Sequence, residues 1–214
     1  MSPARHPLLI GVLALQGAYD AHVRTVATLG ATSRLVRLPL DLHGLDGLIL
    51  PGGESTTMLH FLDRNGFFEV LQTYVKSTPT FGTCAGAILL AARVESPAQR
   101  SLGALDITVE RNAYGRQKDS SILTAPTSLA GPPLEMVFIR APRITRTGPV
   151  VETLASRDGF PTMVRAGNIL AATFHPELSD DHRVHQFFLT LVRQHQTDTV
   201  DKALKGSPTS TPHV

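Results

Sequence analysis

Short apolar runs alternate with amphipathic segments over the first half of the chain. Strand-length apolar runs lie at residues 8–15, 33–38, 47–50 and 79–82. Helical spacing of apolar positions follows over 19–29, 56–62, 67–75 and 85–92, with Asn65-Gly66 interrupting the middle pair. Strands that alternate with helices predict βαβ units. The sequence therefore predicts an α/β fold, a single three-layer domain whose mainly parallel central sheet is covered on both faces.

The pattern changes in the second half, where Gly and Pro separate short β-type segments. These segments cover 102–109, 136–139, 150–155, 162–165 and 169–174, and we expect them to be antiparallel additions to the central sheet. A last helix is predicted over 180–194, and its apolar face carries Val184, Phe187, Phe188, Leu191 and Val192. We expect a flexible N-terminus at 1–7, one domain at 8–194 and a disordered tail at 195–214, with a Pro-rich surface loop at 125–133.

Composition narrows the classes of function. A chain of 214 residues suits one substantial domain. A net charge of +2 gives no reason to expect nucleic acid or an anionic membrane as partner, and no apolar stretch reaches the ~20 residues that span a bilayer. Residues 1–7 lack the apolar core of a secretory signal, so we expect a cytoplasmic protein. We expect no metal, because no ligand spacing suggests one. Cys84 is the single cysteine, so an internal disulfide is excluded.

The surroundings of Cys84 indicate a nucleophile. Gly82-Thr83-Cys84-Ala85-Gly86 lies between a predicted strand and a predicted helix, where a tight turn lifts the side chain above the sheet edge. The start of the helix favours the reactive thiolate, and the N–H of Ala85 could stabilise an oxyanion. Without this context, a lone cysteine is more often a small buried hydrophobe.

His175 and Glu177 are the candidate base and its orienting acid. His175 follows the apolar strand at 169–174, and in near-extended backbone residues two apart face the same side about 6.5–7 Å from each other. Glu177 can then contact one imidazole nitrogen while the other faces Cys84, as in a catalytic triad. The competing interpretation is a turn histidine beside a surface acid. His182 and His185, on the last helix, are expected to be structural or exposed.

A glycine pair after the third predicted strand marks a candidate substrate loop. Gly52 and Gly53 stand at the carboxyl end of that strand, where parallel sheets place ligands, and Glu54 could bind an α-ammonium group. Arg111 and Arg140 could hold an α-carboxylate. A simple strand-to-helix turn with a helix cap, and two surface ion pairs, are the alternatives.

Together these segments resemble the class I glutamine amidotransferases and, more narrowly, the glutaminase subunits of pyridoxal 5′-phosphate synthases. The resemblance runs over about residues 8–194. It is carried by Leu13-Ala14-Leu15-Gln16-Gly17, by residues 50–58 around Gly-Gly-Glu-Ser-Thr, by Phe81-Gly82-Thr83-Cys84-Ala85-Gly86, by residues 109–117 with Arg-Asn-x-x-Gly-Arg-Gln, by Phe138-Ile139-Arg140-Ala141-Pro142 and by Phe174-His175-Pro176-Glu177-Leu178.

The resemblance implies a flavodoxin-like fold, a Cys-His-Glu triad and no cofactor. By it, Cys84 is the nucleophile, His175 the acid/base and Glu177 its orienting residue. The residues implied to bind L-glutamine are Gly52, Gly53, Glu54, Arg111, Ile139 and Arg140, and those of the oxyanion hole are Gly53 and Ala85. The implied partner is a (β/α)₈-barrel synthase that uses the ammonia for pyridoxal 5′-phosphate (vitamin B6) biosynthesis, in an assembly of twelve synthase and up to twelve glutaminase subunits. The Gln16-Gly17 loop is expected near the docking surface.

Three other functions stay open at this point. A glutaminase of another pathway, such as imidazole glycerol phosphate or guanylate synthesis, would keep the triad and change the partner. A redox sensor or chaperone with a cysteine elbow would need no Glu177. A non-catalytic regulatory subunit would keep only the fold.

Overall fold

A computed structural model of the chain describes residues 6–111 and 120–205. Three predicted segments lie wholly or partly outside the described residues: the flexible N-terminus at 1–5, the Arg-Asn-x-x-Gly-Arg-Gln segment at 112–117 and the tail at 206–214. The largest sheet contains β1 (Leu9–Leu13), β2 (Thr32–Val36), β3 (Gly47–Leu50), β4 (Thr80–Thr83), β10 (Glu152–Arg157), β11 (Phe160–Ala166) and β12 (Ile169–Ala172). Its strand order is β10-β11-β12-β4-β3-β1-β2.

This seven-stranded sheet is parallel in its centre and antiparallel at one edge. The pairs β1–β2, β1–β3, β3–β4 and β4–β12 are parallel, whereas β11 pairs antiparallel with both β12 and β10. The predicted α/β class and the mainly parallel sheet are confirmed. The strands β3 and β12 are buried along their whole length, as expected for strands covered on both faces.

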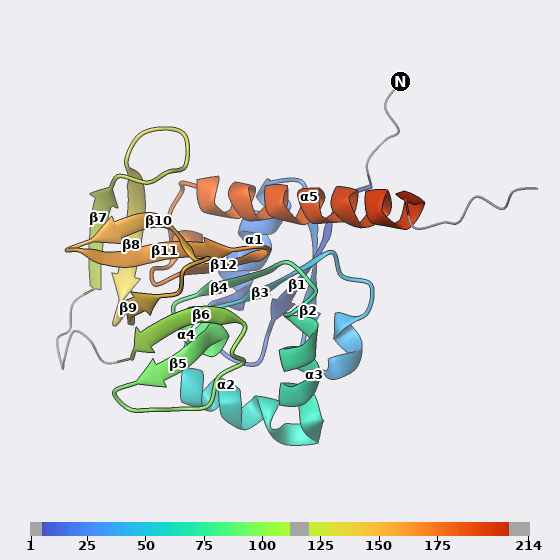
Figure 1. The fold of residues 1–214 in the computed structure, drawn as a ribbon, viewed down its shortest axis with the longest axis horizontal. Helices are drawn as coiled ribbons and strands as arrows, with labels where there is room; N and C mark the ends of the chain where they lie inside the picture. Colours follow the sequence, from blue (N-terminus) through green and yellow to red (C-terminus); the bar gives the residue numbers. More distant parts are fainter. Residues whose placement is uncertain (1–5, 112–119, 206–214) are drawn as a thin grey trace, which may run out of the picture.

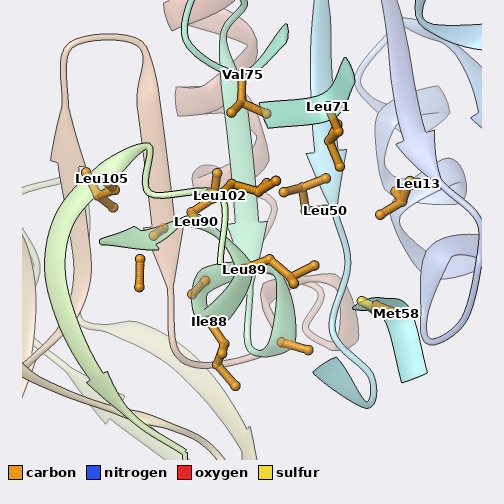
Figure 2. Close-up of a cluster of buried hydrophobic side chains, with 14 of the residues drawn as sticks. Leu13, Leu50, Met58, Leu71, Val75, Ile88, Leu89, Leu90, Leu102 and Leu105 are labelled. Carbon is orange, nitrogen blue, oxygen red and sulfur yellow. The ribbon is translucent and has the colours of Figure 1, made fainter. Parts of the chain in front are cut away.

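Helices cover both faces of the sheet and form the outer layers (Figure 1). On one face lie α1 (Tyr19–Thr28) and α5 (Arg183–Lys205), and on the other lie α2 (Ser55–Leu62), α3 (Phe67–Tyr74) and α4 (Ala85–Leu90). Successive strand residues point to opposite faces, so Leu48 and Leu50 of β3 join one core and Ile49 joins the other. Figure 2 shows the core on the α2–α4 side, where Leu13 and Leu50 of the sheet meet Met58, Leu71 and Leu89 of the helices.

Two smaller sheets extend the domain beyond the central one. One contains β5 (Ala91–Glu95), β6 (Leu105–Glu110) and β9 (Arg143–Thr147), and the other pairs β7 (Ser120–Ala125) with β8 (Leu134–Ile139). The described residues also form the 3₁₀ turns η1 (Pro39–Leu42), η2 (Arg64–Gly66) and η3 (Pro176–Leu178). The prediction that the later strands add to the central sheet was therefore wrong in part, because among the described strands of the second half β10, β11 and β12 do so, whereas β6, β7, β8 and β9 lie in the smaller sheets. The helix predicted over 85–92 is also shorter, since Ala91 begins β5 directly after α4.

The last helix differs from its prediction at the C-terminal end. It was predicted over 180–194 with a disordered tail from 195, whereas α5 continues to Lys205. The stretch after His195 is polar but lacks Gly and Pro up to Lys205, so nothing in it stops the helix. The Gln196 side chain also donates a hydrogen bond of 2.7 Å to Asp46, which ties this extension to the domain. Within the described residues, none of the helices is both long enough and apolar enough to cross a membrane.

Candidate active site

Cys84 occupies a strained turn between β4 and α4. Its backbone has φ 47° and ψ −103°, a conformation that L-residues rarely adopt and that is found most often at functional sites. The turn needs the small neighbour that the sequence provides, because a Cβ on Gly86 would overlap the backbone carbonyl of Leu50. The thiol is thus held at the carboxyl edge of the sheet by the backbone around it.

The register of the sheet brings His175 to the same edge. Parallel strands β4 and β12 pair Thr83 with Ala172, so the residues that follow both strands leave the sheet side by side. The backbone N–H of His175 donates a 2.8 Å hydrogen bond to the carbonyl of Val137 in β8. A Cβ built on Gly52 would meet both the His175 ring and the Cβ of Cys84, so the imidazole and the thiol side chain lie beside each other. Two segments far apart in the sequence therefore meet at one thiol and one imidazole.

Glu177 contacts the other side of the His175 ring. Its Oε1 lies 2.8 Å from Nδ1 of His175, and the Glu177 side chain has no exposed surface. The predicted contact exists, but the assumed extended backbone was wrong, since Glu177 reaches His175 from the 3₁₀ turn η3. Burial alone would lower the pKa of His175. The interactions with Cys84 and Glu177 outweigh it and raise that pKa to about 10, so the imidazole is a cation at neutral pH.

The glycine loop after β3 packs directly against the histidine. A Cβ on Gly52 would overlap the His175 imidazole, which explains why this position carries a glycine. Two residues later, the backbone N–H of Glu54 donates a 2.7 Å hydrogen bond to Oε1 of Gln16. The carbonyl of Gly52 accepts a 3.1 Å hydrogen bond from the Ala18 N–H. The Gln16-Gly17 loop thus supports the candidate substrate loop.

A cavity of about 240 Å³ opens over the thiol. It is lined by Gln16, Gly53, Glu54, Ser55, Cys84, Ile88, Arg111, Ile139, Arg140 and His175. Ligand pockets for drug-sized molecules have volumes of roughly 300–1,000 Å³, so this cavity suits a smaller ligand. Three of the candidate site residues are not among those that line the cavity. Gly52 packs against the His175 ring, Ala85 is buried at the start of α4, and Glu177 is buried behind the imidazole.

The far side of the cavity carries charges of both signs. Glu54 lies 3.3 Å from Arg111, whose side chain is largely buried, so Arg111 is not a simple surface residue. The pKa of Glu54 lies below its usual value, chiefly because of the hydrogen bond from the Thr56 hydroxyl. Arg111 and Arg140 lower this pKa further, although burial opposes them. Arg140 has a positive φ of 45°, a second strained backbone at the cavity. A zwitterionic ligand would meet complementary charges here.

Sequence reasoning missed several residues of this region. Ser55 and Ile88 line the cavity, and they carried only a helix-cap pattern and a helical apolar pattern. His22 has no exposed surface and lies next to Glu177, yet it had no predicted role. Its position one turn before Val26 on the apolar face of α1 was the available signal, because a histidine at a core-facing position must find partners inside the protein.

Comparison with known proteins identifies the family. A model of the SNO glutamine amidotransferase family matches residues 12–194. The chain belongs to this family. It is 59% identical over 184 residues to the pyridoxal 5′-phosphate synthase subunit PdxT of Koribacter versatilis (strain Ellin345), covering 86% of this chain and 95% of that relative. It is 51% identical over 186 residues to PdxT of Thermotoga sp. (strain RQ2), covering 86% and 99%.

Solved structures agree with membership of the SNO glutamine amidotransferase family. A crystal structure of a glutamine amidotransferase superposes with a TM-score of 0.80 at 43% identity, covering 86% of this chain and 98% of that one. A glutamine amidotransferase from Thermotoga maritima has a TM-score of 0.55 at 11% identity, covering 90% and 86%, and shares the fold. The resemblance inferred from the motifs is thereby confirmed at the level of family and fold.

Proposed function

We propose that this chain hydrolyses L-glutamine to L-glutamate and ammonia, as the glutaminase component of a pyridoxal 5′-phosphate synthase. The observation that carries the proposal is the arrangement of Cys84, His175 and Glu177 beside a cavity with charges of both signs. The names of the PdxT relatives support the choice of pathway over other glutaminases.

In the proposed reaction, Cys84 is the nucleophile and His175 transfers the protons. The Cys84 thiolate attacks the side-chain amide carbon of glutamine and forms a tetrahedral oxyanion, which the backbone N–H groups of Gly53 and Ala85 stabilise. The His175 imidazolium then donates its proton to the departing nitrogen, the C–N bond breaks, and ammonia leaves behind a γ-glutamyl thioester.

Hydrolysis of the thioester completes the cycle. Neutral His175 takes a proton from water, whose oxygen attacks the thioester carbon, and the C–S bond breaks to release glutamate and the thiolate. The imidazolium is restored in the same step. Glu177 keeps Nδ1 of His175 protonated and stabilises the positive ring, as the third member of the triad.

The charged wall of the cavity supplies the recognition of a free amino acid. Glu54 faces the α-ammonium group, and Arg111 and Arg140 face the α-carboxylate. Backbone at Gly53 and Ile139 encloses the substrate side chain, and Gly52 supports this wall from its position against His175. Glu54 and Arg111 already form an ion pair, so a ligand that interrupts it must offer a partner to each charge. A zwitterion does this with its α-ammonium and α-carboxylate groups, whereas an ion of one sign leaves one side chain without a partner.

The proposed partner is a (β/α)₈-barrel synthase that consumes the ammonia in a sealed passage, in an assembly of twelve synthase and up to twelve glutaminase subunits. The Gln16-Gly17 loop, hydrogen-bonded to the substrate loop, is the proposed link between docking and the active site. Ammonia that escaped into water would be protonated and lost as a nucleophile, which favours direct transfer.

The test compares wild type and Cys84→Ala, each mixed with the synthase. We expect the variant to release no glutamate from glutamine, while pyridoxal phosphate formation from added ammonium salt continues in the same mixture. That second reaction shows that the synthase is intact. Glutamate release by Cys84→Ala at the wild-type rate would exclude the proposed chemistry.

Two further arms separate the alternative functions. Diazo-oxo-norleucine, a glutamine-like electrophile, should label Cys84 of a glutaminase and leave a regulatory or redox protein unlabelled. Activation by the barrel synthase, and not by synthases that make imidazole glycerol phosphate or guanylate, would support the proposed pathway. Activation by one of those instead would assign the chain to that pathway.

A further inference from the structure

A buried polar cluster lies behind Glu177, on the side away from the cavity. Nε2 of His22, from α1, lies 3.5 Å from Oε2 of Glu177 and 3.2 Å from Oγ1 of Thr83. Nδ1 of His22 lies 2.9 Å from Nε2 of His185, from α5. Three elements that are distant in the sequence thus bring polar side chains together here, and His22 is the member that lies against the Glu177 carboxylate.

Both histidines of this cluster are neutral. Neither has any exposed surface. Burial chiefly, and in addition the neighbouring imidazoles of His185 and His175, hold the pKa of His22 well below its usual value, and burial lowers the pKa of His185 to about 3. The titratable groups around the cluster are Glu177 and His175 on one side and His182 beside His185 on the other. The described part of the chain contains no group of three or more potential ligands arranged to hold a metal ion.

Electrostatics selects one tautomer for His22. A neutral imidazole carries one N–H, and a lone pair on Nε2 would point at the negative Glu177 carboxylate. The proton therefore sits on Nε2, where it faces Oε2 of Glu177 and Oγ1 of Thr83. Nδ1 of His22 must then accept from an Nε2–H of His185. This leaves Nδ1 of His185 as the lone-pair end of the chain, and that atom has no hydrogen-bond partner among the described residues.

The free oxygen of Glu177 needs such a donor. Oε1 is bonded to His175, but Oε2 makes no hydrogen bond with any residue that the structure describes. The terminal torsion of a glutamate has broad, roughly two-fold preferences, so one hydrogen bond alone fixes the carboxylate poorly. A buried carboxylate without a second donor is also costly. An N–H on Nε2 of His22, 3.5 Å from Oε2, would answer both problems.

We propose that His22 is a positioning residue for the candidate triad: its Nε2–H holds the Glu177 carboxylate against His175, and His185 fixes the tautomer that makes this possible. The inference rests on the proposed function insofar as Glu177 orients a catalytic histidine. It adds two residues that touch neither substrate nor reacting atoms. The chain His185–His22–Glu177–His175–Cys84 then links the α1/α5 layer to the thiol.

The test compares His22→Gln with His22→Met. The two replacements have nearly the same length and volume, but only glutamine can donate an N–H toward Glu177. In the complex with the synthase, we expect His22→Met to lower kcat for glutamine hydrolysis by roughly ten- to a hundredfold, the range seen for partners that orient catalytic-site ligands. The KM for glutamine should stay within about twofold, since substrate contacts are untouched. His22→Gln should recover most of the lost kcat.

The pH profile gives a readout that a packing defect would not move. A poorly held Glu177 stabilises the His175 imidazolium less, so the alkaline limb of kcat should shift to lower pH in His22→Met by about one unit, the size expected from one charge-assisted hydrogen bond. Val26→Ala, four residues later on the same helix, is the matched control for loss of packing. It should lower the melting temperature without moving the pH limb.

Either of two kinetic results with His22→Met would overturn the inference: a kcat equal to that of His22→Gln, or a pH limb at its wild-type position. If His22→Met does not fold, His185→Met is tested in its place. This variant keeps His22 but removes the partner of its Nδ1, so the His22 proton is free to move from Nε2 to Nδ1. An unchanged kcat and pH limb in His185→Met would also refute the inference. Alkylation of Cys84 by iodoacetamide across pH, measured on the chain alone, separates the two proposals. If wild type is alkylated normally but releases no glutamate with the synthase, the proposed function is refuted. Slower alkylation of His22→Met than of His22→Gln would still support the positioning role of His22, and equal alkylation rates would refute that role.

Discussion

The backbone N–H of Cys84 donates a hydrogen bond of 2.8 Å to the carbonyl oxygen of Ala172. This bond continues the β4–β12 ladder by one residue beyond β4, so the strained turn at the thiol is tied to the strand that leads to His175. The relative position of the Cys84 and His175 backbones is therefore set by strand register. The expected consequences of this geometry can be measured.

Replacing Glu177 by glutamine should damage catalysis more than folding. The amide is nearly the same size but carries no charge to stabilise the His175 imidazolium, and it can present an N–H where an acceptor is needed. We expect kcat for glutamine hydrolysis to fall by about 10²- to 10⁴-fold, as for the corresponding change in serine protease triads. Steady-state assays in the presence of the synthase measure this. A kcat within threefold of wild type would rule out an orienting role for Glu177.

The glutaminase reaction should fail at high pH because of His175. Its pKa is raised to about 10, so the imidazolium that protonates the leaving ammonia is present at neutral pH and is lost as the pH rises through about 10. We expect kcat to be flat around neutrality and to fall on that alkaline limb. The limb should be measured with the intact complex, whose integrity at each pH is checked by gel filtration. A limb between pH 7 and 8 would contradict the ion-pair geometry.

Gly52→Ala should disable the site while leaving the fold intact. The added Cβ overlaps the His175 ring, which must move away from Cys84, and displacements of about 1 Å at a reacting centre cost on the order of a hundredfold in rate. Gly44→Ala is the control for a glycine replaced without a clash, since a Cβ there meets no atom within 4 Å. Its φ of +71° adds a backbone penalty that Gly52, which has no positive φ, does not carry, so backbone strain alone would harm the control more. We expect the control to retain its kcat. Comparable activity in both variants would show that the loop tolerates a side chain beside His175.

Arg111→Met should weaken glutamine binding specifically. Removing one charged hydrogen-bond partner of the α-carboxylate is expected to raise the KM for glutamine by roughly ten- to a hundredfold. The rate of Cys84 alkylation by iodoacetamide, a small neutral reagent, should not change. Arg100→Met serves as control, because Arg100 pairs with Asp63 and Glu69 on the surface at 2.9 and 2.6 Å. An unchanged KM in Arg111→Met would remove Arg111 from the substrate contacts.

His185 should make the protein sensitive to acid. Its pKa is lowered to about 3 in the folded state, so below the ordinary value of 6.5 the unfolded chain binds a proton that the folded chain refuses. Stability is therefore lost as the pH falls from 6.5 toward 3. Between pH 7 and pH 4, we expect wild type to lose about 3 kcal/mol more unfolding free energy than His185→Phe, at 1.36 kcal/mol per pH unit. Urea unfolding at both pH values measures the difference, and equal losses would show that His185 does not resist protonation.

The sequence determined the α/β class, the order of the first strands and helices, and the three candidate triad residues. It could do so because these features are local: β3 is a continuous apolar run, the amphipathic period marks the helices, and the glycines around Cys84 and Gly53 permit turns that other residues resist. The family resemblance then assigned roles to Cys84, His175 and Glu177, and the structure brings these three side chains together.

The tertiary structure alone decided what depends on contacts between distant segments. The sequence contained no sign that β5, β6 and β9 form a separate sheet, because strand pairing is chosen by packing and not by the strands themselves. Nor could it place His22 against Glu177 and His185 against His22, since a histidine in an amphipathic helix looks the same whether it faces solvent or a buried polar group. Burial makes that difference, and burial becomes defined only when α1 and α5 close over the same face of the sheet.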